Sequence, residues 1–221
     1  MKILFQGDSL TDAGRSREET RPNVHLGNGY VNMIAGRLIA ENPGAGYQIF
    51  NRGINGNRVA DLYARWIEDA LNPEYDVLSI LCGINDVGFG LRLNCGSSAE
   101  RFEMIYDLML TEVRQTHPEA KLVMVEPFIF KMKYPDGPRG FDIYEGWETW
   151  SSEIRKRGAA ARRLAQKHGA LYVEMFDLFE QLSAEYGPET FSLDCIHLTP
   201  AGNAVLAGRW IEEVRKAGYI D

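Results

Sequence analysis

The sequence KILFQGDSL, Lys2 to Leu10, decides the fold, because a short apolar run gives way at once to Gly7, Asp8 and Ser9. Apolar residues without polar alternation are typical of a strand that is buried on both faces of a parallel sheet. Gly7 would permit a sharp turn directly after that strand. We therefore predict that the chain begins with a buried strand that presents a polar turn at its carboxyl end.

Four further apolar or β-branched stretches predict strands at residues 47–51, 76–81, 121–127 and 170–175. Segments with apolar residues at helical spacing separate them, at residues 30–41, 58–71, 99–116 and 150–168. A last helix would run from Pro200 to about Lys216, with Thr199 as its N-cap. This alternation implies right-handed crossovers and an α/β three-layer sandwich around a five-stranded parallel sheet. The segment 130–147, rich in Gly, Pro and aromatic residues, is predicted to be a loop over one end of the sheet.

The composition fits an ordinary globular domain, with 221 residues of which 45% are hydrophobic and 25% are charged. One sizeable core is possible at this length, so residues 1–221 are expected to form a single domain. The formal net charge of -7 argues against a nucleic-acid partner, which needs a clustered basic face. The basic runs 155–157 and 162–163 are predicted to line the solvated face of a helix.

No targeting or membrane-spanning segment is visible in the sequence. The apolar stretch after Lys2 is too short for a signal-peptide core, and no run approaches the ~20 residues of a membrane span. Cys82, Cys95 and Cys195 form no C-x-x-C pair, which suits a reducing compartment. We expect a cytoplasmic protein with free thiols that binds no membrane.

Ser9 is a candidate nucleophile, because reactive groups of open parallel sheets gather at the carboxyl ends of the strands. A serine hydroxyl needs a base within hydrogen-bond reach. His197 lies just before the last helix and follows Asp194 by three residues. In one turn Asp194 could accept the imidazole Nδ1–H and orient Nε2 toward the serine. Alternatively, Asp194 helps to cap the helix and His197 is a surface side chain.

Two glycine-containing and asparagine-containing turns follow the second and third predicted strands. The N–H of Gly53 and the side-chain amide of Asn85, together with the N–H of Ser9, could stabilise the oxyanion of an ester's tetrahedral intermediate. Taken singly, each stretch is more typical of a simple turn, since Gly and Asn tolerate positive φ.

These four blocks, namely Gly7-Asp8-Ser9-Leu10, the loop at Gly53, Gly83-x-Asn85-Asp86 and Asp194-x-x-His197, occur in the order of the blocks of SGNH (GDSL) hydrolases. The chain resembles that family over nearly its whole length. The resemblance implies the flavodoxin-like SGNH hydrolase fold, with Ser9, Asp194 and His197 as the catalytic triad and Ser9, Gly53 and Asn85 as the oxyanion hole. The rival α/β-hydrolase motif Gly-x-Ser-x-Gly is not met, because Thr11 replaces its second glycine.

A closer likeness is to small intracellular bacterial acetylxylan esterases, in residues 26–31, 61–66 and 83–87. That likeness implies hydrolysis of O-acetyl esters on xylo-oligosaccharides and assembly into homo-oligomers. Relatives of this type can carry Trp just before the catalytic Asp, where this chain has Leu193.

We therefore expect a serine esterase that takes a small-molecule, short-acyl ester through an acyl-enzyme and needs no cofactor. The alternatives are a lysophospholipase or thioesterase for longer chains, and an inactive carbohydrate-binding member of the fold. The histidines at 25, 117 and 168 are scattered, so no catalytic metal is predicted. The aromatic side chains of residues 128–150 either stack on sugar rings, or fill the core beneath the loop or meet another subunit.

Overall fold

The structure is a computed structural model that describes residues 1–18, 20–133 and 143–221. Its centre is a parallel sheet with the strand order β2-β1-β3-β4-β5. The strands are β1 (Lys2–Gly7), β2 (Gln48–Asn51), β3 (Val77–Leu81), β4 (Lys121–Val125) and β5 (Leu171–Val173). The predicted five-stranded parallel sheet is therefore confirmed, and its order is the flavodoxin-like one, with the switch point between β1 and β3.

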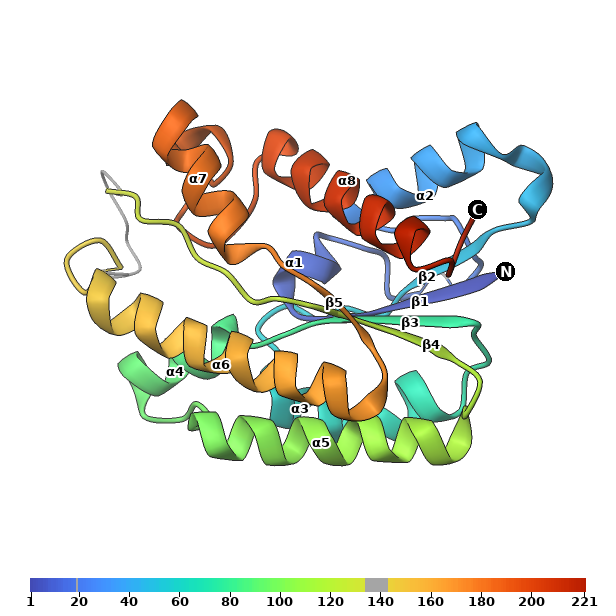
Figure 1. Cartoon of the computed structure of the whole chain (residues 1–221), viewed down its shortest axis with the longest axis horizontal. Coiled ribbons are helices and arrows are strands. Elements are labelled where there is room, and N and C mark those ends of the chain that lie inside the picture. Colours follow the sequence, from blue (N-terminus) through green and yellow to red (C-terminus); the bar gives the residue numbers. More distant parts are fainter. Residues whose placement is uncertain (19, 134–142) are drawn as a thin grey trace.

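Helices cover both faces of the sheet, which confirms the three-layer sandwich (Figure 1). One layer contains α2 (Tyr30–Glu41), α7 (Phe176–Tyr186) and α8 (Pro200–Lys216). The opposite layer contains α3 (Val59–Ala64), a π-helical turn (Ile67–Leu71), α5 (Ala99–Thr116) and α6 (Trp147–His168). Short 3₁₀ turns lie at Pro43–Ala45 and Pro188–Thr190.

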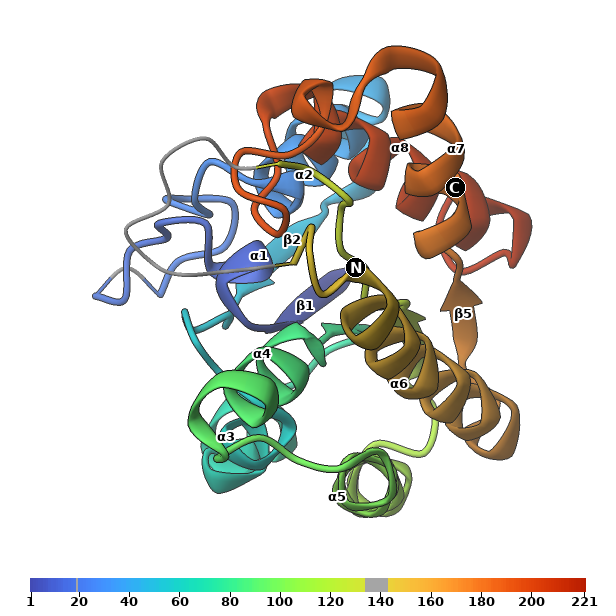
Figure 2. The ribbon, with the colours of Figure 1, turned by 90° about the vertical axis from the view of Figure 1, so that its left-hand side faces the viewer.

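Two further helices begin at the carboxyl end of the sheet, which faces the viewer in Figure 2. The four-residue helix α1 (Ser9–Asp12) follows β1, and α4 (Ile84–Leu93) follows β3. Because β1 and β3 are neighbours, the first residues of α1 and α4 meet at the switch point, where open α/β sheets bind ligands.

The structure differs from the predicted elements in several places. The helix expected at 58–71 is divided, since α3 ends at Ala64, and the helix expected at 150–168 already begins at Trp147. Helices α4 and α7 were not predicted. The loop predicted at 130–147 is described only in part, because residues 134–142 lie outside the described residues. Residues 130–133 and 143–146 are described and form no strand.

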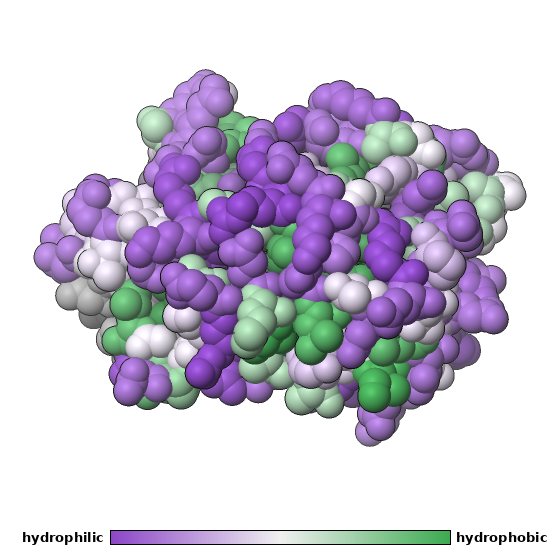
Figure 3. Space-filling view, turned by 60° about the horizontal axis from the view of Figure 1, so that its bottom comes forward, coloured by the Kyte–Doolittle hydropathy of each residue, from purple (hydrophilic) through white to green (hydrophobic). Residues whose placement is uncertain are grey.

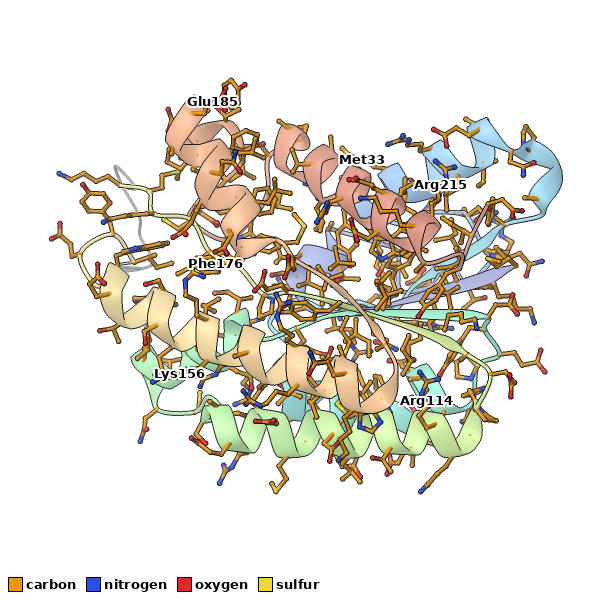
Figure 4. The ribbon with its side chains drawn as sticks, viewed as in Figure 1. Met33, Arg114, Lys156, Phe176, Glu185 and Arg215 are labelled. Atoms are coloured by element: carbon orange, nitrogen blue, oxygen red, sulfur yellow. The ribbon has the colours of Figure 1, made fainter. Side chains whose placement is uncertain are left out.

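Side-chain hydrogen bonds join helices within each layer and join one layer to the sheet. Trp210 of α8 donates its indole N–H to Ser79 Oγ of β3 at 3.0 Å. Arg114 of α5 donates to the carbonyl of His168 at 2.9 Å, and Arg215 of α8 pairs with Glu41 of α2 at 2.6 Å (Figure 4). The sheet edge that carries the candidate site is thus supported by a packed scaffold.

The surface formed by α3 and α5 carries both hydrophobic and hydrophilic residues (Figure 3). Large apolar side chains on this side include Ile67, Met104 and Leu108, which are 64%, 65% and 44% exposed. Among the described residues, no helix combines the length and the apolar character that a membrane span requires.

Candidate active site

Ser9 is the first residue of α1, and only Asp8, the N-cap of that helix, separates it from the buried strand β1. The Asp8 carboxylate caps the turn by accepting the N–H of Leu10 at 3.0 Å. Gly7 is required by close packing, because a Cβ there would lie 2.3 Å from Thr11 Oγ1 and 2.5 Å from the carbonyl oxygen of Leu81. The predicted sharp turn after the first strand is therefore present, and it leaves the Ser9 hydroxyl half-buried at the sheet edge.

The loop before α8 brings Asp194 and His197 to that hydroxyl. His197 Nε2 lies 2.9 Å from Ser9 Oγ, and His197 Nδ1 lies 2.7 Å from Asp194 Oδ2. Asp194 Oδ1 also accepts the backbone N–H of His197 at 2.8 Å and that of Ile196 at 3.2 Å. The three predicted triad residues are therefore joined in one hydrogen-bonded chain.

The geometry of this loop is a turn rather than a helical repeat. Cys195 stands at its apex with φ of 73°, and Leu193 N–H donates to the His197 carbonyl at 2.7 Å. The Cys195 carbonyl accepts the N–H of Phe130 at 2.8 Å, which ties the loop to the segment after β4. Burial raises the pKa of the Cys195 thiol to about 11, so it is a poor nucleophile at neutral pH.

Asp194 is held in its ionised form. Its partial burial alone would raise the pKa, but the hydrogen bonds from the His197 ring and from the backbone outweigh that effect, and the pKa lies below its usual value. An ionised carboxylate at Nδ1 fixes the tautomer in which Nε2 is free to accept a proton.

A pocket of about 330 Å³ opens over Ser9 and His197. Its other lining residues are Asn55, Gly56, Asn85, Phe89, Arg92 and Ile196. The Asn85 amide donates to the carbonyl of Asn57 at 3.1 Å, which fixes its orientation and leaves its second hydrogen for a ligand. The structure therefore brings the predicted Asn85 to Ser9, beside both apolar and cationic side chains.

The structure does not bring Gly53 to the pocket in the expected role. Its N–H donates to Asn51 Oδ1 at 2.9 Å and is not available to an oxyanion. Its backbone instead packs against α1, since a Cβ would lie 2.4 Å from the nitrogen of Asp12. The glycine that lines the pocket is Gly56, whose N–H has no acceptor among the described residues. The prediction of Gly53 as the donor is therefore not supported by this geometry. Gly53 and Gly56 lie in the same short loop after β2, and the sequence does not show which of the two N–H groups is free.

Two buried carboxyls behind the site were not predicted. Asp8 is fully buried and its Oδ2 has no partner in the described part of the chain, and burial raises its pKa to about 7. Asp86 is also fully buried, and burial raises its pKa to about 6 although it accepts the N–H of Val59 at 3.0 Å. Both residues belong to the sequence blocks, but only the fold shows that they are buried.

The aromatic residues after β4 lie mostly in the core. Phe128, Phe130 and Trp150 are at most 5% exposed, and Phe128 and Phe130 both pack against Phe179. Tyr144 is exposed, whereas residues 134 and 141 lie outside the described part. In the ranges that the structure describes, no three His, Cys, Asp or Glu side chains converge as they would around a metal ion.

Comparison with known proteins gives a consistent result. A model of the GDSL-like lipase/acylhydrolase family matches residues 5–205. An acetylxylan esterase from Geobacillus stearothermophilus is 31% identical over 216 residues, which cover 96% of this chain and 93% of that protein.

Solved structures show the same relationship at the level of the fold. A catalytic mutant of Axe2, an acetylxylan esterase from Geobacillus stearothermophilus, superposes with a TM-score of 0.84 at 28% identity over 96% of this chain and 93% of that one. LAE5, an alpha/beta hydrolase enzyme from the metagenome of Lake Arreo in Spain, gives 0.81 at 29% identity over 97% and 94%. The catalytic mutants of Axe2 replace a serine, a histidine or an aspartate by alanine, and the aspartate precedes the histidine by three positions.

Proposed function

Because this chain belongs to the GDSL-like lipase/acylhydrolase family and is a carboxylic ester hydrolase, we propose that Ser9, His197 and Asp194 form its catalytic triad. The observation that carries this proposal is the chain of hydrogen bonds from Asp194 through His197 to Ser9, at 2.7 and 2.9 Å. The catalytic mutants of Axe2, with the same spacing of aspartate and histidine, support it.

The reaction proceeds in two acyl-transfer steps. His197 Nε2 accepts the Ser9 proton as Oγ attacks the ester carbonyl, and it then gives the proton to the departing alcohol. An acyl-enzyme on Ser9 remains, which water hydrolyses with His197 again as the base. Asp194 stabilises the imidazolium in both steps and stays ionised.

The oxyanion of each tetrahedral intermediate would be held by three donors. These are the N–H of Ser9, the N–H of Gly56 and the Asn85 side-chain amide, in place of the Gly53 N–H that the sequence predicted. Both backbone donors are free of acceptors among the described residues, and Asn85 already has its orientation fixed by Asn57. Each such donor is worth roughly 10²–10³ in rate.

The substrate is a short-acyl ester, and O-acetyl groups on a carbohydrate such as a xylo-oligosaccharide are the proposed natural class. The acetylxylan esterase from Geobacillus stearothermophilus, which is 31% identical, supports this choice. Phe89 and Ile196 are the large apolar walls of the pocket over Ser9, and walls of this kind beside the nucleophile favour a short acyl group. Leu193, where acetylxylan esterases of this type can carry Trp, is 58% exposed beside Asp194.

The test is a series of p-nitrophenyl esters from acetate to decanoate, with initial rates measured for the wild type and for Ser9→Ala. We expect the wild type to prefer acetate and the variant to lose several orders of magnitude in kcat. A preference for the long esters would favour the lysophospholipase or thioesterase alternative. Equal rates for variant and wild type would remove Ser9 from the mechanism.

Acetylated xylo-oligosaccharides are the second substrates, because a preference for p-nitrophenyl acetate does not define the alcohol. We expect the wild type to release acetate from them and Ser9→Ala to lose this activity.

Assembly into homo-oligomers and a cytoplasmic location stay predictions, as does the single domain at 1–221.

A further inference from the structure

The turn that carries Gly56 has a defined geometry. The N–H of Asn57 donates to the carbonyl of Ile54 at 3.2 Å, and Gly56 has φ of 81° at the third position. A positive φ at that position is the mark of a type II turn, in which glycine is favoured. We call residues 54–57 the donor turn, because its central peptide supplies the Gly56 N–H.

The donor turn is fastened to the nucleophile turn by one side chain, that of Asp12. Its Oδ2 accepts the backbone N–H of Asn55, the residue directly before Gly56, at 2.9 Å. Asn55 is exposed, and it is the backbone N–H of this residue, not its side chain, that binds the Asp12 carboxylate. The donor turn is also anchored at its start, where Ile54 N–H donates to the Gly7 carbonyl at 3.0 Å.

Asp12 lies on the same short helix as the nucleophile. It is the last residue of α1, three positions after Ser9, and is 5% exposed. The carboxylate also accepts the Gly14 N–H at 3.2 Å and pairs with Arg17 at 3.2 Å. The Arg17 side chain is 59% exposed, so this ion pair is screened by water, whereas the bond to Asn55 is part-buried.

We propose that Asp12 is a positioning residue, a proposal that rests on the proposed function. Through its hydrogen bond to the Asn55 N–H, Asp12 fixes the distance between the Gly56 N–H and Ser9 Oγ. An oxyanion donor is effective only when its distance to the developing charge is fixed beforehand. The Asp12 carboxylate itself touches no reacting atom. Its contribution is the rigid connection between the turn that holds the nucleophile and the turn that holds the donor.

The test compares p-nitrophenyl acetate with its thiono analogue, in which sulfur replaces the carbonyl oxygen. Sulfur is a weak hydrogen-bond acceptor, so the ratio of kcat/KM for the oxygen ester to that for the thiono ester reports on the oxyanion donors. A loss of folded enzyme lowers both rates equally and leaves the ratio unchanged. Asn85→Ala, which removes a proposed donor outright, provides the reference value.

For Asp12→Ala we expect the ratio of oxygen-ester to thiono-ester kcat/KM to fall at least ~10-fold, because the Gly56 N–H is displaced and not removed. The fall should appear in kcat, with little change in KM. Asp12→Asn keeps an acceptor for the Asn55 N–H and should restore most of the ratio. Arg17→Ala removes only the ion pair and should match the wild type. If Asp12→Ala fails to fold by circular dichroism, Asp12→Ser, whose hydroxyl is too short to reach Asn55, takes its place.

An unchanged ratio in the Asp12 variant would overturn the proposal, and so would an equal fall in Arg17→Ala. The failure of the proposed function is distinguishable, because Ser9→Ala would then keep the activity of the wild type. If Ser9→Ala is inactive and the Asp12 ratio is unchanged, only the positioning role is lost.

Discussion

His197 Nε2 lies 2.9 Å from Ser9 Oγ, although 188 positions separate the two residues. Ser9 follows the second strand of the sheet order and His197 precedes the last helix, so their contact depends on the whole sandwich. The partner of His197 is local by contrast, since Asp194 is only three positions away.

Asp194→Asn is expected to lower kcat on the order of 10⁴-fold while the protein stays folded. The asparagine amide would donate to Nδ1, so the proton would move to Nε2, and His197 could no longer accept the Ser9 proton. Asp177→Asn, at a side chain that is 84% exposed, is the matched control and should keep the kcat of the wild type. A kcat within tenfold of the wild type in Asp194→Asn would contradict the proposed role of this carboxylate.

Gly53→Ala is expected to lower stability by about 1–3 kcal/mol, as overpacking does. The new Cβ would lie 2.4 Å from the nitrogen of Asp12 and 2.8 Å from the carbonyl carbon of Thr11, and neither backbone atom can move freely. The control is Gly36→Ala in α2, where no atom lies within 4 Å of the added Cβ. Urea unfolding of both variants measures the difference, and equal midpoints would refute the close packing seen at Gly53.

Asp8→Asn is expected to remove part of the pH dependence of stability. The pKa of Asp8 is raised by burial to about 7, against an unfolded value near ~4, so the folded state binds the extra proton between these values. The free energy of unfolding therefore falls as pH rises through this window, by at most ~4 kcal/mol for this group. Asp86, raised to about 6, acts in the same direction.

The measurement is the Tm of wild type and Asp8→Asn at pH 5 and at pH 8. The neutral amide keeps an acceptor for the Leu10 N–H, so the variant should gain relative to the wild type at pH 8 and gain only about a third as much at pH 5, where the unfolded carboxyl has begun to ionise. Asp177→Asn again controls for the change in net charge. A gain of the same size at both pH values would mean that Asp8 does not titrate in this window.

The repeating features of the fold could be predicted from the sequence, because periodicity reports them directly. The short apolar or β-branched stretches predict the five parallel strands, and the helices predicted at 30–41 and 99–116 match α2 and α5 at both ends. Helix α4 was missed because its glycines at 88 and 90 suggest a loop, whereas packing against Trp150 favours the helix. Tertiary contacts override local propensity in such a segment.

At the site, residue identity could be predicted but orientation could not. The sequence predicts Ser9 and Asn85 after strands and Asp194 and His197 before the last helix, and the structure joins Ser9, His197 and Asp194 by hydrogen bonds. The sequence cannot show which N–H of a glycine-rich turn is free, since the Gly53 N–H is taken by the side chain of Asn51. Likewise Arg157, predicted on a solvated helix face, is only 3% exposed and donates to the carbonyl of Ser97.

Phe89→Ala is expected to shift the acyl preference toward longer chains. Phe89 follows Asn85 by one helical turn, and its Cζ lies 4.0 Å from the place of a Cβ on Gly56. The Arg58 guanidinium lies 5.9 Å from the ring centroid and is itself held by Asp61 at 2.8 Å. The ring is therefore a fixed wall close to the proposed oxyanion donors.

Truncating this wall opens room for additional methylene groups next to the reacting carbonyl. One methylene in an apolar pocket is worth roughly 10–200-fold in kcat/KM, so the ratio of butanoate to acetate hydrolysis should rise about tenfold or more. Leu91→Ala, two residues along α4 and outside this pocket, is the control and should keep the ratio of the wild type. If both variants keep it, the limit on chain length lies at another wall, and Ile196 beside His197 is then the next position to truncate.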